Sequence, residues 1–144
     1  VIKRNGADEP YRLEPSSERL RVRVGSGDVV IAPGEHMYEI TYETDVRVKP
    51  GATADELYWN VTGNGWAFHI DRAEGIVHLP GDARMIAADF FTGVTGAQGK
   101  DAEVATDEAG GVHVRTTRAL APYEGLTIVV SWPKGFVTNQ SGGQ

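Results

Sequence analysis

Apolar and polar residues alternate with a period of two along much of this chain. The clearest alternating sets cover residues 20–24, 38–48, 112–114 and 126–132. Neighbouring side chains of a β-strand point to opposite faces of its sheet, so this period predicts strands with one buried face. Weaker patterns predict further strands at residues 56–61, 76–79 and 85–91.

Turn signals built on glycine and proline separate these sets. They stand at residues 23–28, 32–35, 49–51, 80–82 and 109–111. Glycine supplies positive φ and proline presets φ in such turns. A helical period is missing from the sequence, although residues 102–109 have the composition of one short helical turn. Short strands between frequent turns predict an all-β fold, an antiparallel β-sandwich of the immunoglobulin-like or jelly-roll-like kind.

Length and composition narrow the class of protein. The chain has 144 residues, which suits one domain, and we expect that domain to cover residues 1–137. The polar, glycine-rich residues 138–144 read as a flexible linker tail. A net charge of −6 argues against nucleic-acid binding, and the lack of cysteine excludes disulfides and thiolate sites.

Candidate catalytic groups are scattered along the sequence. The four histidines lack the close spacing of a metal site, and adjacent acids such as Asp55 and Glu56 point to opposite faces of a strand. A nucleophile motif of the G-x-S-x-G type is also missing. We therefore do not expect an enzyme, a bound metal or a cofactor. A hydrolase is a weaker hypothesis than the two binding or structural roles given below.

The segment of residues 55–68 concentrates aromatic rings and amides. It holds two of the three tryptophans beside two tight glycine turns. In one interpretation the rings pack in the core and the amides bond the turn backbone. In the other they form a recognition surface for a sugar or peptide. The candidate residues in either case are Trp59, Asn60, Asn64, Trp66 and Phe68.

Residues 55–66, which read DELYWNVTGNGW, carry a family resemblance. Residues 33–42, 77–80, 120–127 and 132–135 add weaker matches. Together they resemble the N-terminal domain of unknown function of the YciQ-like predicted membrane proteins. The resemblance implies a bacterial, extracytoplasmic domain anchored through transmembrane segments outside this chain. It assigns no catalytic residue.

The resemblance also implies that the family's first strands precede residue 1. An unpaired strand edge near the N-terminus would favour weak self-association. Our leading hypothesis is a non-catalytic extracytoplasmic domain that binds a protein or stabilises its parent. The alternative is a carbohydrate-binding module of the cell envelope that uses the tryptophans and asparagines.

Overall fold

The structure is a computed structural model that describes residues 1–17, 20–44 and 48–137. All regular structure in these ranges is β, so the predicted all-β antiparallel class is confirmed. Within the same ranges we find no helix with the length and hydrophobicity needed to cross a bilayer. The chain forms two compact units, Val1–Val46 and Arg47–Gln144.

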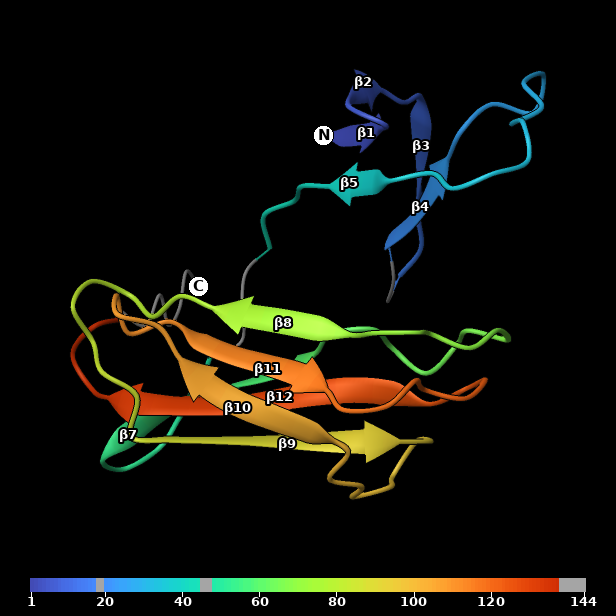
Figure 1. Ribbon diagram of the computed structural model, residues 1–144. Helices are drawn as coiled ribbons and strands as arrows, with labels where there is room; N and C mark the ends of the chain where they lie inside the picture. The colour runs from blue at the N-terminus through green and yellow to red at the C-terminus, as the bar shows by residue number, and fades with distance from the viewer. Residues whose placement is uncertain (18–19, 45–47, 138–144) are drawn as a thin grey trace. The chain divides into compact units, whose positions relative to one another are not determined.

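The first unit contains a small sheet and a separate hairpin (Figure 1). The sheet has the order β2-β1-β5, from β1 (Ile2–Arg4), β2 (Ala7–Asp8) and β5 (Tyr38–Ile40). The hairpin pairs β3 (Tyr11–Pro15) with β4 (Leu20–Val24). Ile2 is the only buried apolar side chain among the described residues of this unit.

The two faces of the hairpin differ sharply. Its register places Leu13 opposite Val22 on one face, and Arg12 opposite Arg23 on the other. Tyr11, Val24 and Leu20 extend the apolar face, on which Tyr11, Leu13, Leu20 and Val22 are exposed. The charged face is neutralised in part by Glu14, which contacts Arg23 at 3.2 Å.

The second unit has two antiparallel sheets (Figure 1). The four-stranded sheet has the order β6-β7-β12-β9, from β6 (Lys49–Pro50), β7 (Ala54–Asn60), β12 (Gly125–Pro133) and β9 (Ala87–Gly93). The three-stranded sheet has the order β10-β11-β8, from β10 (Ala102–Thr106), β11 (Val112–Thr116) and β8 (Glu74–Val77).

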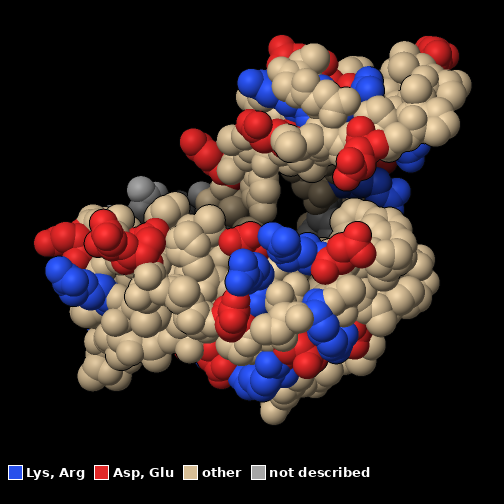
Figure 2. All heavy atoms as spheres, viewed as in Figure 1, with Lys and Arg blue, Asp and Glu red and all other residues tan. Residues whose placement is uncertain are grey.

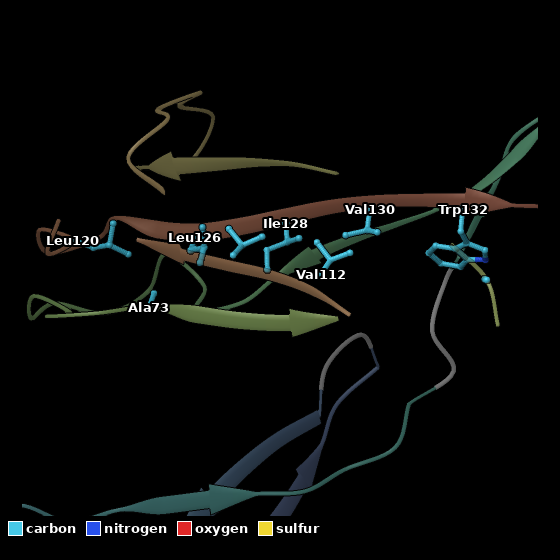
Figure 3. Packing of buried hydrophobic residues seen from close by; sticks show 9 residues of the cluster. Ala73, Val112, Leu120, Leu126, Ile128, Val130 and Trp132 are labelled. Atoms are coloured by element: carbon cyan, nitrogen blue, oxygen red, sulfur yellow. The ribbon is translucent and has the colours of Figure 1, made fainter. Parts of the chain in front are cut away.

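The core of the second unit lies between these sheets. Alternate residues of β12 are buried, and they pack with Val112 and Val114 of β11 (Figure 3). The β12 contributors are Leu126, Ile128, Val130 and Trp132. Each fully buried aliphatic side chain contributes roughly 1.5–3 kcal/mol. This arrangement is the predicted sandwich, and strict alternation along β12 produces it.

Most predicted strands are present with shifted ends, but one prediction was wrong. A single long strand over residues 38–48 does not form, because β5 ends at Ile40 and residues 41–44 are irregular. Its partner β1 offers only three residues, Ile2 to Arg4, for pairing. Residues 102–106, where a helical turn was an option, instead form β10 against β11.

The single domain expected over residues 1–137 stays a prediction, and the structure is described as two compact units. The division at residue 46 separates the first unit from the sandwich, which follows it in the sequence. The tail expected at residues 138–144 lies outside the described residues.

Charged side chains of both signs intermingle on the face shown in Figure 2. Among the described residues, opposite charges also form ion pairs across strands, such as Arg115 on β11 with Glu103 on β10. Exposed pairs of this kind each contribute about 0–1 kcal/mol. The visible surface therefore does not present a basic patch of the type that binds nucleic acid.

Candidate functional site

The five candidate residues begin at the end of β7. Cross-strand pairing puts Trp59 opposite Ile128 on the core side of the sheet, where the indole is half-buried. Asn60 follows on the outer side, opposite Thr127, and is exposed. Its Oδ1 accepts long hydrogen bonds from Gly63 N–H (3.3 Å) and Thr127 Oγ1 (3.4 Å). Trp59 and Asn60, which are neighbours in the motif, thus lie on opposite faces of the sheet.

Asn64 joins three loops at one end of the sandwich. Its Nδ2 donates to the carbonyl of Gly93 at 2.9 Å, just where β9 ends, and to the carbonyl of Tyr123 at 3.2 Å. A side-chain amide suits this task because its two N–H groups serve two carbonyls at once. Asn64 thus links its loop to the end of β9 and to the turn before β12.

The same loop packs tightly on the start of β12. Thr62 Oγ1 accepts the Leu126 N–H at 3.0 Å. A Cβ added to Gly125 would lie 2.7 Å from the Gly63 carbonyl oxygen and 3.0 Å from Asn64 Nδ2. Only glycine allows this approach, so the glycine of the 120–127 segment is explained by the loop opposite it.

Trp66 and Phe68 are the exposed aromatic members of the candidate set. Their side chains stack at a tilt, with centroids 5.3 Å apart and planes at 39°. Trp66 is 48% and Phe68 59% exposed. The indole Nε1 donates to the Thr62 carbonyl at 2.6 Å, and the Trp66 carbonyl accepts the Tyr123 N–H. The loop thus anchors the indole of Trp66, while both rings remain largely open to solvent.

An ion-pair network supports the turn that Asn64 contacts. Arg118 reaches Glu124 at 2.7 Å and Asp101 at 2.9 Å. Glu124 also accepts the Ala121 N–H at 2.8 Å, which closes the turn of residues 121–124. The Arg118 hydrogen bond, and then the Ala121 N–H, lower the pKa of Glu124 below its ordinary value of 4.5.

The histidines make local polar contacts. His113 Nε2 lies 3.0 Å from Asp107 Oδ2 in the β10–β11 turn, and His69 lies 3.1 Å from Asp71. The Gly111 N–H, followed by His113, lowers the pKa of Asp107. His36 contacts Asn5 and the Ala32 carbonyl. Across the described part of the chain, no three His, Asp or Glu side chains gather as a metal site would require.

A second group of residues, of which sequence reasoning named only Asn60, lies on the outer face of the four-stranded sheet. Asn60, Thr127 and Phe91 form one row across β7, β12 and β9, and Tyr58 stands in the next row. Strand alternation predicts which side chains share a face. It does not give the register that places Phe91 beside Thr127, because these residues are far apart in the sequence.

Comparison with known proteins identifies the family. The family model described as "Predicted membrane protein (DUF2207) N-terminal domain" matches residues 1–132. The chain is 26% identical, over 147 aligned positions, to the uncharacterized protein YciQ of Escherichia coli (strain K12). The alignment covers 99% of this chain but only 22% of the length of YciQ. A search of solved structures gives no match.

The family match includes the loop built by Thr62, Asn64 and Trp66, and the turn of residues 121–124 on which that loop packs. The expected resemblance to the YciQ-like proteins is confirmed over nearly the whole chain. The chain belongs to the family of predicted membrane proteins defined by this N-terminal domain of unknown function.

Proposed function

We propose that this chain is a non-catalytic domain on the extracytoplasmic face of a membrane protein, and that it binds a protein partner through Trp66 and Phe68. We count other parts of the same parent protein as partners too, because the chain covers only 22% of the length of its curated relative. One observation carries the proposal: two adjacent aromatic rings are exposed, and the indole of Trp66 is anchored by a hydrogen bond to its own loop.

Fixed, exposed aromatic rings suit protein recognition for two physical reasons. Their burial in an interface removes a large apolar area from water, and Trp is among the residues that dominate binding energy. A ring that is already immobilised loses little conformational entropy on binding. Trp66 satisfies its indole N–H internally, through Thr62, so a partner can cover it without leaving that group unpaired.

The non-catalytic part of the proposal is supported by the polar contacts of the described histidines. His113 and Asp107 belong to a hairpin turn, where Asp107 also accepts the Gly111 N–H at 2.7 Å. His69 and Asp71 form a pair open to solvent. Both arrangements fit local stabilisation of a turn or a surface, and Asp107 also lines an open hollow beside the β10–β11 turn.

The partner is tested by site-specific photo-crosslinking in the full-length parent protein in cells. A crosslinker at Phe68 should give a discrete adduct, and Trp66→Ala should abolish that adduct. A crosslinker at Ile76, an exposed apolar position of β8, is the matched control. Equal adducts at Phe68 and Ile76, or an adduct insensitive to Trp66→Ala, would contradict the proposal.

The extracytoplasmic placement is tested separately. The chain has no cysteine, so Ala67→Cys in the exposed loop creates a unique thiol within it. In intact cells a membrane-impermeant maleimide should label the full-length variant, and the parent without the substitution sets the background. Labelling only after cell lysis would place the domain on the other side of the membrane.

A further inference from the structure

An open hollow of about 440 Å³ lies on the outer face of the four-stranded sheet. Its floor comes from β7, β12 and β9, and its wall is the loop of residues 93–98 that follows β9. Small-molecule sites typically have volumes of roughly 300–1,000 Å³, so this hollow is large enough for a ligand. It is independent of Trp66 and Phe68, which do not line it.

The floor combines aromatic rings with neutral polar groups. Asn60, Thr127 and Phe91 are cross-strand neighbours in one row, so amide, hydroxyl and ring lie next to one another. Tyr58, one row along on the same face, is 60% exposed. The floor thus offers hydrogen-bonding groups between two rings.

The phenyl ring of Phe91 is fixed by a cation. Lys100 Nζ lies 4.3 Å from its centroid, and the same ammonium contacts Asp89 and the Phe90 carbonyl. Lys100 therefore covers part of Phe91 and is itself neutralised by Asp89. Tyr58 remains as the ring available for stacking, while Phe91 contributes an apolar part of the floor.

The lining of the hollow is uncharged. Although 24% of the chain is charged, none of the described residues that line the hollow is Asp, Glu, Lys or Arg. Anionic and cationic ligands are usually held by opposite charges, which make the strongest hydrogen bonds. A neutral ligand rich in hydroxyl groups fits these surroundings better than a phosphate, a carboxylate or an amine.

A sugar ring matches each of these features. Its C–H faces are apolar and stack on an aromatic ring, and its rim of hydroxyls exchanges hydrogen bonds with amides and hydroxyls. We propose that the hollow bounded by Tyr58, Asn60, Phe91 and Thr127 binds a neutral oligosaccharide. Tyr58 stacks on one sugar ring, while the side chains of Asn60 and Thr127 bond its hydroxyls.

The proposal is tested with the whole 144-residue chain by NMR titration. The probes are cellotetraose, chitotetraose and maltotetraose, with tetragalacturonate as an anionic control. At least one neutral probe should shift the amide resonances of Tyr58, Gly93 and Thr127 saturably, with a dissociation constant below about 1 mM. Tetragalacturonate should bind at least about tenfold more weakly.

Variants then locate the site. Tyr58→Ala should weaken binding at least about tenfold, whereas Tyr58→Phe, which keeps the ring, should stay within about threefold of the parent. Tyr42→Ala is the matched control, because Tyr42 is 63% exposed and belongs to the first unit. Dispersed spectra verify that each variant is folded.

Three results would overturn the proposal: no saturable shift with any neutral probe, full binding by Tyr58→Ala, or equal binding of the anionic probe. None of them affects the protein-binding proposal for Trp66 and Phe68. The crosslinking experiment, in turn, does not use the hollow, so the two proposals fail separately.

Discussion

Asn64 illustrates how one side chain can hold a loop in place. It serves the carbonyls of Gly93 and Tyr123, which belong to two different segments of the second unit. Asn60, in the same motif, makes only long bonds from an exposed position. The two asparagines therefore differ in their expected contribution to stability.

We expect Asn64→Ala to lower the free energy of unfolding by about 1–3 kcal/mol, because two carbonyls lose their donor. Asn60→Ala should change it by no more than about 0.5 kcal/mol, as is usual for surface substitutions. Urea denaturation followed by tryptophan fluorescence measures both. Equal losses in the two variants would contradict the role assigned to Asn64.

Glycine is needed at position 125 because neighbouring atoms leave no room for a Cβ, and not because of its backbone conformation. A methyl group at this position meets the Gly63 backbone at 2.7 Å, so Gly125→Ala should destabilise the protein by about 1–3 kcal/mol. Gly65→Ala is the matched control, because a Cβ there has nothing within 4 Å. Thermal unfolding of both variants tests the difference, and a neutral Gly125→Ala would show that the loops separate easily.

The three tryptophans have three different environments. Trp132 is 3% exposed within the core, whereas Trp66 is 48% exposed and Trp59 lies between these extremes. We expect Trp132→Ala to cost about 3–5 kcal/mol and Trp66→Ala less than about 1 kcal/mol. Chemical denaturation checks this order, and a larger loss for Trp66 would mean that its ring is buried in solution.

At the scale of elements, the β3–β4 hairpin has an apolar face that the first unit leaves exposed. Exposed apolar strands tend to associate with other chains. We propose weak self-association through this hairpin, in line with the expectation for the N-terminal strands. Val22→Lys should weaken it, whereas Val30→Lys, at an exposed valine outside the strands, should not.

Sedimentation velocity over a wide concentration range measures this association. A concentration-dependent increase in the sedimentation coefficient, reduced by Val22→Lys alone, is the expected outcome. A monomer at every concentration would remove the hairpin as an association surface.

Sequence patterns predicted some elements far better than others. β12 was predictable because four alternate residues, Leu126 to Trp132, all enter the core. Residues 38–48 also alternate, yet among the described residues 38–44 and 48 only Tyr38–Ile40 pairs with another strand. Alternation reports which side chains share a face, and it does not report how much partner strand is available.

For the candidate site, too, the sequence predicted local features better than the features that depend on contacts between distant segments. Amides beside glycines indicated hydrogen bonds within the turn, and Asn60 accepts one from Gly63, whereas Asn64 bonds the distant Gly93 and Tyr123 carbonyls. The exposure of Trp66 and the row that joins Asn60 to Phe91 depend on tertiary register. Period-two reasoning within one strand contains no information on that register.

At the scale of the whole molecule, ionised carboxylates link stability to pH. The pKa of Glu124 is lowered chiefly by Arg118, that of Asp89 chiefly by Lys100 and that of Asp107 chiefly by the Gly111 N–H. A carboxyl group with a lowered pKa in the folded state stabilises the protein above its unfolded pKa. That stabilisation is lost as the pH falls through the lower folded value.

We therefore expect the melting temperature to be level from about pH 7 to about pH 5 and to fall below about pH 4.5. Glu124→Gln should lower the melting temperature at neutral pH and make the acid decline shallower. Glu108→Gln, in the exposed β10–β11 turn, is the control and should reproduce the parent profile. An unchanged acid profile for Glu124→Gln would contradict the role assigned to the Arg118 pair.

The location of the hydrophobic cluster in the sandwich bears on how the sequences of such chains can evolve. Every described member of that cluster lies after residue 47, within the second unit. Substitutions at the described residues of the first unit leave the side chains of this cluster unchanged. Selection can therefore remodel the leading 46 residues to suit a new neighbour while the body that follows keeps its shape.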